Sequence, residues 1–382
     1  LYPDEVFSNT GETGQWHREK GERLALAWLR QRGTTGFTEW DSNCYFEEDI
    51  LALSHLADLA ETVEVRELAA VAMDKMFFTM ALNSYKGTFG STHGRTYSRL
   101  IKGSHREATS GISRLAWGMG VWNESIRGTV SVASSGYELP GPIGAVALDL
   151  STELWNKEQH GPDPAHSVNK VTYRTADYML CSAQDYHPGE KGYQQHVWQA
   201  TLGPGAVVFV THPPCSSEEG AHRPNFWHGN YVLPRVAQWK GTLAAVHSLP
   251  EDDWMGFTHA YWPVYQFDGQ TIREDKDGQQ WAFARIESGY LALTATQGLS
   301  LVKQGPTAYG ELRSYGQHNV WLCMMGREET DGSFEAFQEA VLGLEIDLRE
   351  LGVSCTTLRG ESFSFGWEGP LVVDGDEPVS YT

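Results

Sequence analysis

Residues 45–82 decide the fold class, and they read YFEEDILALSHLADLAETVEVRELAAVAMDKMFFTMAL. Apolar residues such as Ile50 and Leu53 recur at the spacing of one helix face, and three acidic residues fill the first turn, where the helix dipole favours them. This pattern predicts one helix over about 45–60 and a second over 64–82. Because only a few residues separate them, the two helices are expected to lie antiparallel as a hairpin.

Helical patterns also flank this hairpin, whereas the rest of the chain has the character of a β protein. Spacing predicts a helix over 15–32, ending at Gly33, and another over about 107–121. From Val130 onward, Gly, Pro and Ser separate short runs rich in β-branched and aromatic residues, which predict strands. The clearest of these runs are 170–181, 194–202, 206–210, 243–247, 281–286, 290–296 and 319–325.

The order of the elements, helices first and strands after, is typical of an α+β protein with segregated layers. A chain of 382 residues favours two packed units. We predict an α/α toroid segment of helical hairpins over 1–128 and an antiparallel β-sandwich over 129–382. Four helices are too few to close a toroid. We therefore expect an incomplete ring, completed by a missing N-terminal segment or by a second copy of the chain.

Composition and charge exclude several classes of protein. The chain is 41% hydrophobic and 12% aromatic, which is typical of a folded protein, and it has no apolar run long enough to span a membrane. Its net charge is −20 without any block of Lys or Arg, which argues against nucleic acid and anionic membranes as partners. The start at Leu1 lacks the features of a signal peptide, so we expect a mature or truncated chain.

The cysteines carry no motif. None of the five has C-x-x-C spacing, so no thiolate metal site is indicated, and two, one or no disulfides all remain open. These residues are Cys44, Cys181, Cys215, Cys323 and Cys355.

The loop Gly87–Tyr97 concentrates the side chains that proton abstraction needs. His93 offers a base, Arg95 a fixed cation and Tyr97 a phenol within five residues. Removing the C5 proton of a uronic acid requires a base, a group that neutralises the carboxylate, and an acid for the leaving oxygen. We therefore consider these three residues candidate catalytic groups. In the alternative reading, Arg95 pairs with a helix terminus and His93 only hydrogen-bonds its own loop.

A second polar cluster precedes the helix at about residue 45. Asn43 stands where it either caps that helix or neutralises a substrate carboxylate. Trp40 and Glu47 are candidate substrate contacts. The carboxylates Glu39, Asp41 and Glu47 also permit a rival function, glycoside hydrolysis by a carboxylate pair across a cleft.

A third cluster lies in the β region. His196 shares a strand face with Trp198, and Trp227 with its polar neighbours at a turn suits stacking on a sugar ring. The alternatives are a buried, hydrogen-bonded histidine and ordinary core packing of the tryptophan. The candidate substrate-binding residues of this region are His196, Arg223, Trp227, His228 and Asn230.

These clusters, in this order, resemble the heparinase II/III-like lyases, in which an incomplete α/α toroid precedes an antiparallel β-sandwich. In that family an Asn or His at the start of a toroid helix is followed by the catalytic Tyr at nearly the separation between Asn43 and Tyr97 here. The resemblance implies β-elimination of a uronate-containing polysaccharide, with Tyr97 as acid and base or His93 as base, and Asn43 with Arg95 neutralising the carboxylate.

The sandwich motifs of that family are matched only in part. Trp198 stands where an Asp ligand of a structural metal would be, so we expect no cofactor, and a divalent metal near the β-sandwich stays open as an alternative. The resemblance further implies an acidic polysaccharide or oligosaccharide as partner and a secreted or periplasmic location. A non-catalytic carbohydrate-binding module is the third function considered, and the polar loops between the helices disfavour it.

Overall fold

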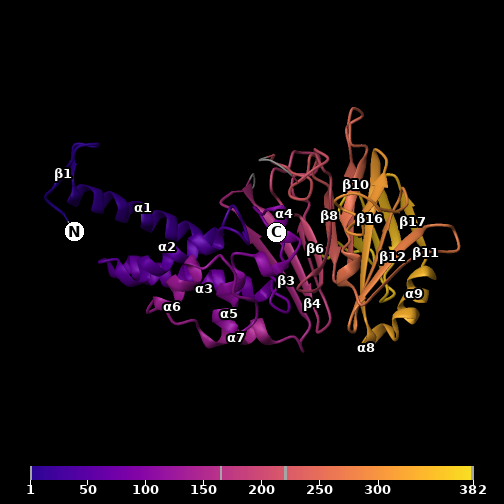
Figure 1. Ribbon diagram of the computed structural model, residues 1–382, viewed down its shortest axis with the longest axis horizontal. Coiled ribbons are helices and arrows are strands. Elements are labelled where there is room, and N and C mark those ends of the chain that lie inside the picture. Colours follow the sequence, from indigo (N-terminus) through magenta and orange to yellow (C-terminus); the bar gives the residue numbers. More distant parts are fainter. Residues whose placement is uncertain (1, 164–165, 219–221, 380–382) are drawn as a thin grey trace.

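The structure is a computed structural model that describes residues 2–163, 166–218 and 222–379. It confirms an α+β protein with a helical part followed by several antiparallel sheets. Figure 1 shows α1 to α7 (residues 14–148) at one end of the long axis and the β layers, with α8 and α9 (residues 328–342), stacked towards the other end. Most helices thus precede most strands, as the sequence pattern predicted, and α8 and α9 are the exception.

The first three helices form at the predicted places. α1 (Gly14–Thr35) starts after Thr13, whose hydroxyl accepts a hydrogen bond from the Trp16 N–H. It ends at Gly36, where φ is 71°, and not at Gly33, because the left-handed turn that stops the helix falls on the later glycine. α2 (Phe46–Leu59) and α3 (Val63–Leu82) follow as the expected hairpin, and α3 also packs against α1.

The helical part continues beyond the predicted boundary at residue 128. α6 packs on α2 and α7 packs on α3, so both belong to the helical layer, and it extends to Leu148. Their sequences did not predict helices, because β-branched residues and glycines dominate them. The further helices of this part are α4 (Ser98–Ile101), η1 (Ser104–Arg106), α5 (Ser110–Trp117), α6 (Arg127–Ser134) and α7 (Gly141–Leu148).

The sheet nearest the helices has eight antiparallel strands. The predicted run 170–181 is in fact two of them, because the Thr175 hydroxyl accepts hydrogen bonds from the N–H groups of Asp177 and Tyr178 and so fixes a tight turn. In spatial order the strands are β14 (Ser300–Leu301), β15 (Glu311–Tyr315), β10 (Phe257–Tyr261), β7 (Ala206–Thr211), β6 (Trp198–Gly203), β5 (Met179–Gln184), β4 (Val168–Arg174) and β3 (Leu154–His160).

A six-stranded antiparallel sheet packs face to face on the first. Leu180 and Val208 of the larger sheet share one core with Leu243 and Leu291 of the smaller one, and all four are fully buried. Burial of these side chains is the main force that holds two such sheets together. The strands in order are β11 (Gly269–Glu274), β12 (Gln280–Ile286), β13 (Gly289–Ala295), β16 (His318–Arg327), β9 (Thr242–Ser248) and β8 (Arg235–Trp239).

A third β layer, which the sequence pattern did not reveal, covers the outer face of the six-stranded sheet. Phe337 and Val353 of this layer pack on Phe283 in a second core. Figure 1 shows this yellow C-terminal segment at the end farthest from the helices. Its elements are α8 (Glu328–Asp331), α9 (Phe334–Leu342), β17 (Ile346–Arg349), β18 (Gly352–Thr356), β19 (Ser362–Gly366) and β20 (Val372–Val373).

The remaining elements are short, and the cysteines are not paired. β1 (Val6–Phe7) and β2 (Glu12–Thr13) form a small ribbon before α1, and η3 (Val264–Gln266) follows β10. All five cysteines are free thiols, so no disulfide forms. In the described part of the chain, no helix combines the length and apolar character that crossing a membrane requires.

Candidate functional site

Two loops of the helical part lie side by side and carry most of the predicted site residues. The loop before α2 and the loop between α3 and α4 are joined by a hydrogen bond from the Gly94 N–H to the Trp40 carbonyl oxygen at 2.8 Å. The Thr96 hydroxyl donates to the side-chain oxygen of Asn43 at 2.7 Å. The structure therefore brings Asn43 close to the segment that carries Tyr97.

A segment of the β region is joined to the same place. His93 and His196 exchange backbone hydrogen bonds of 2.9 and 2.8 Å, and the Thr96 N–H donates to the Gln194 carbonyl oxygen. The His228 ring lies edge-on to the Tyr97 ring, with 5.8 Å between their centres. The helical and β parts thus meet at the Tyr97 loop.

The hydroxyl of Tyr97 faces three polar side chains at the partly exposed rim of this junction. It lies 3.3 Å from the Tyr45 hydroxyl, 3.5 Å from an Arg95 nitrogen and 3.4 Å from an Arg223 nitrogen. These are long hydrogen bonds, which contribute little to stability. We call Tyr45, Arg95, Tyr97, Arg223 and His228 the Tyr97 cluster.

The surroundings of Tyr97 favour its charged form. Burial alone would raise the pKa of the phenol, but hydrogen bonds with Tyr45, Arg95 and Gln194 outweigh burial and lower it. The pKa of Tyr45 is raised instead, first because its hydroxyl bonds to Tyr97. The pair therefore shares its protons unequally, and Tyr97 is the phenol that loses its proton more easily.

The two arginines of the cluster differ in their partners. Arg95 forms an ion pair with Glu39 at 2.9 Å, and its guanidinium lies 4.8 Å from the centre of the Tyr45 ring. Arg223 is exposed, packs against the Tyr97 ring, and forms no ion pair within the residues that the structure describes. A carboxylate that enters beside Tyr97 would therefore meet one paired cation and one that has no ion pair with any described residue.

His228 is fixed as a neutral hydrogen-bond donor. Its Nδ1 accepts from the Ser98 N–H at 3.2 Å, so the proton of the neutral ring sits on Nε2. Burial lowers the pKa of His228 to about 4. The His222 backbone opposes this shift, yet Nε2 makes no well-formed hydrogen bond in the described part of the chain. The ring is thus held in place next to Tyr97, with Nε2 buried and not open to a ligand.

Other side chains of the same loops point inward and are sealed from water. Asp41 is 0% exposed and forms a buried ion pair with Lys170, while the Ser91 hydroxyl donates to it at 2.5 Å. Lys170 also contacts Glu158 at 3.2 Å. Burial would lower the pKa of Lys170, but Asp41 and Glu158 raise it further, so the lysine stays charged.

His93 and His196 belong to this inward set. Their rings stack with 5.7 Å between centres, and His93 Nδ1 donates to the carbonyl oxygen of Asp41. His196 Nε2 bonds to the Gln199 side chain at 2.9 Å. Burial lowers the pKa of each imidazole to about 3, so both are uncharged at neutral pH. The structure gives both residues a packing role and does not place His93 at the rim with Tyr97.

Asn43 also lies inside, and it does not cap α2. Tyr45 stands directly before α2 and makes no capping hydrogen bond with its side chain. The side-chain oxygen of Asn43 accepts a hydrogen bond from Thr96 and not from the first turn of α2. The Asn43 amide lies beside Glu107, whose pKa burial raises to about 8. Asn43 therefore connects two loops from behind the cluster, and it is fully buried.

Four predicted substrate contacts are also buried. The Trp40 indole N–H donates to Thr92, and Glu47 accepts from the Gly128 N–H. Trp227 stacks on His259 with 4.1 Å between ring centres. Asn230 accepts a hydrogen bond from the His212 N–H. These contacts are structural, so sugar contact by Trp40, Glu47 or Asn230 is not part of the site that this conformation presents.

Sequence reasoning missed three members of the site. Tyr45 and Gln194 gave no signal, because nothing in a single sequence says which tyrosine or glutamine will face a distant loop. Ser98 adjoins Tyr97, but its contact with His228 spans 130 positions. Long-range contacts of this kind depend on the packing of the two parts and not on local spacing.

Two histidines of the β part are each paired with one acid. His212 bonds to Asp253 at 3.0 Å and His259 to Glu311 at 2.9 Å. In the part of the chain that the structure describes, no group of three or more His, Cys, Asp or Glu residues could hold a metal ion.

Comparison with protein-family models, with curated proteins and with solved structures found no match for this chain. We therefore infer function from the chemistry of the Tyr97 cluster.

Proposed function

We propose that this protein is a polysaccharide lyase that cleaves a uronate-containing polysaccharide or oligosaccharide by β-elimination. In this proposal the helical part is a segment of an α/α toroid and the stacked sheets are the β-sandwich of a heparinase II/III-like enzyme. The observation that carries the proposal is the Tyr97 hydroxyl, which lies within 3.5 Å of two guanidinium groups at a partly exposed junction of both parts. This arrangement supplies an acid, a base and charge neutralisation together.

The chemistry follows from these groups. Tyr97, as phenolate, takes the proton from C5 of the uronate, and the electron pair of that bond becomes the C4–C5 double bond. The C4–O bond breaks with its electrons going to oxygen, and the Tyr97 phenol then returns the proton to this oxygen. No water enters, and the phenolate is restored for the next cycle.

The two arginines make the first proton removable. Loss of the C5 proton spreads negative charge into the carboxylate, and nearby cations stabilise that charge as it develops. The long contacts of Arg95 and Arg223 with Tyr97 are weak enough for a substrate carboxylate to replace. The buried His228 ring packs edge-on against the Tyr97 ring and helps to hold it in place.

The rival hydrolase needs two carboxyl groups facing one cleft. Asp41 is sealed in its ion pair with Lys170, and Glu47 is buried against the Gly128 N–H. Only Glu39 of the three candidates is exposed, and it is paired with Arg95. The geometry therefore favours elimination over hydrolysis.

Replacement of Tyr97 by phenylalanine tests the proposal. Tyr97→Phe removes the transferable proton and only long hydrogen bonds, so turnover should fall by about 10² to 10⁴ while unfolding free energy changes by less than about 1 kcal/mol. The assay is the ultraviolet absorbance of the 4,5-unsaturated product, screened over a panel of uronans. Tyr315→Phe, at another exposed tyrosine, is the matched control.

Full activity of Tyr97→Phe would contradict the lyase mechanism. Cleavage that yields new reducing ends without this absorbance, and that is lost in Glu39→Gln but kept in Tyr97→Phe, would establish the hydrolase instead.

A further inference from the structure

A pocket of about 520 Å³ adjoins the Tyr97 cluster. It is lined by Arg99 of α4, the helix that follows Tyr97 directly, and by Trp227, the neighbour of His228. Ser98 and His228 join these two segments by hydrogen bonds. The pocket is large enough for a small ligand, and the chain segments that carry Tyr97 and His228 continue into its lining.

Positive charge gathers on one wall of this pocket. Arg99, Lys102 and Arg106 line it, and among the described lining residues the one carboxylate is that of Glu218, which contacts Lys102 at 2.5 Å. Within the described part of the chain, Arg99 pairs with Glu124 at 3.8 Å. Arg106 is exposed and forms no ion pair with any described residue. The wall therefore keeps cationic groups available to a ligand.

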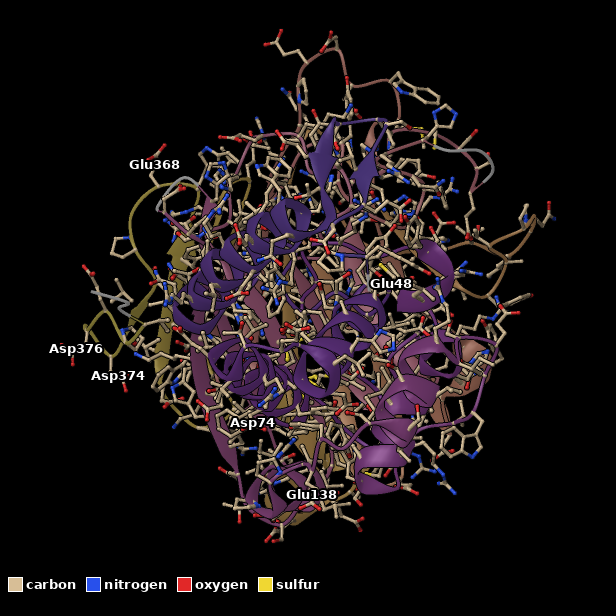
Figure 2. All side chains as sticks on the ribbon, turned by 90° about the vertical axis from the view of Figure 1, so that its left-hand side faces the viewer. Glu48, Asp74, Glu138, Glu368, Asp374 and Asp376 are labelled. Atoms are coloured by element: carbon tan, nitrogen blue, oxygen red, sulfur yellow. The ribbon has the colours of Figure 1, made fainter. Side chains whose placement is uncertain are left out.

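This local charge is opposite to that of the whole chain, whose net charge is −20. Figure 2, seen from the helical end, shows labelled carboxylates such as Glu48, Asp74 and Asp376 spread apart over the molecule. Dispersed acids keep the surface negative in general, whereas the pocket concentrates three cations in one short segment. Such a focus of charge favours an anionic ligand.

An exposed aromatic ring stands at the same pocket. The Tyr265 side chain is 68% exposed, and its hydroxyl lies 3.3 Å from that of Tyr261. Tyr261 is buried, donates to the Lys102 carbonyl oxygen and packs edge-on against Trp227. Tyr265 is thus tethered to the wall that carries the cations. An aromatic face beside hydrogen-bonding groups suits the C–H face of a sugar ring.

We propose that this pocket is a subsite for a second acidic sugar unit of the same polysaccharide that is cleaved at Tyr97. The proposal rests on the lyase function and sharpens it, because it requires a substrate with carboxylates on more than one unit. Arg99 and Arg106 would hold the second carboxylate, and Tyr265 would stack on that sugar ring. A simple inorganic anion would use the arginines but not the tyrosine.

The test measures binding in the Tyr97→Phe background, where the ligand is not consumed. Calorimetry with hexasaccharides of polygalacturonate and polymannuronate should show binding, and neutral cellohexaose should bind much more weakly. Arg106→Ala and Tyr265→Ala should each weaken binding of the acidic hexasaccharide by about tenfold, the usual worth of a charge-assisted contact or a stacked ring. Arg349→Ala, an exposed arginine on β17, removes the same charge elsewhere and should leave binding unchanged.

Three results would overturn the subsite. They are equal binding of acidic and neutral hexasaccharides, an effect of Arg106→Ala no larger than that of Arg349→Ala, and displacement by inorganic phosphate with no effect of Tyr265→Ala. Activity separates this failure from failure of the lyase proposal. An inactive Tyr97→Phe with unchanged binding in Arg106→Ala rejects the subsite alone, whereas an active Tyr97→Phe with impaired binding in Arg106→Ala rejects the lyase chemistry alone.

Discussion

The Tyr97 cluster and the buried network around Asp41 both take residues from the same two loops, yet only the first is partly exposed. The Tyr97 hydroxyl makes contacts of 3.3 to 3.5 Å at the rim, whereas Asp41 is enclosed, with a lysine and a hydroxyl in direct contact. A buried charge must be compensated fully, because an uncompensated one is very costly in a protein interior. A reactive group at the surface can remain loosely held.

A loop that is rich in polar residues is therefore not by itself a functional site. His93 and Arg95 are two positions apart, but His93 is buried and neutral whereas Arg95 is charged and partly exposed. Burial and compensation separate a structural role from a chemical one. Substitutions in the buried network should therefore lower stability, and substitutions at the rim should lower activity.

Removal of Lys170 should break the buried network. Lys170→Met leaves Asp41 charged and without its main partner, which should lower the free energy of unfolding by about 3–5 kcal/mol. Urea denaturation measures this loss. Lys86→Met, which breaks an exposed pair with Glu287, is the control and should cost less than about 1 kcal/mol. A Lys170→Met protein as stable as the wild type would show that Asp41 is not charged inside the fold.

Much of the helical part could be predicted from the sequence, because the apolar residues of α2 and α3 recur at the spacing of one helix face. α6 was missed, since Thr129, Val130 and Val132 favour strands locally and become helical only by packing on α2. The C-terminal layer was missed for a similar reason. Its strands are short, and their apolar residues are buried only by packing on the six-stranded sheet, which the local sequence does not reveal.

The candidate site shows the same limit. The family resemblance implied that Asn43 acts together with Tyr97, and the structure joins Asn43 to the Tyr97 loop through Thr96. No pattern in the sequence could tell that Asn43 and His93 would face inward while Tyr45 would face Tyr97. The direction of a side chain in a loop depends on which distant strand the loop meets.

The buried histidines should make stability depend on pH. Burial holds the folded-state pKa of His93 at about 3, below its ordinary value of 6.5, so its contribution to stability is complete above pH 6.5 and declines as pH falls towards 3. The slope is up to about 1.4 kcal/mol per pH unit for each such histidine. His93→Asn keeps a donor for the Asp41 carbonyl oxygen and should show a shallower loss between pH 6.5 and 4.

Urea denaturation at several pH values provides the measurement, with His55→Asn, at an exposed position of α2, as the control. An unchanged slope in His93→Asn would mean that this ring accepts a proton inside the fold.

The smallest effect is expected at Glu39. Glu39→Gln breaks an exposed ion pair with Arg95, so stability should change by less than about 1 kcal/mol and turnover by less than about fivefold. The absorbance assay and a denaturation curve measure both quantities. A large loss of turnover would show that Glu39 takes part in the reaction itself.

The pairing of Asp41 with Lys170 also determines when the helical part can complete its core during synthesis of the chain. The two residues are 129 positions apart, and at about 5–20 residues per second the lysine emerges roughly 6–26 s after the aspartate. Until then the nascent helical segment holds an acid that it cannot bury. Tyr45, Arg95 and Tyr97 thus emerge from the ribosome early, but the scaffold that orients them stays incomplete until β3, β4 and the later segment with Gln194 and His196 have also emerged.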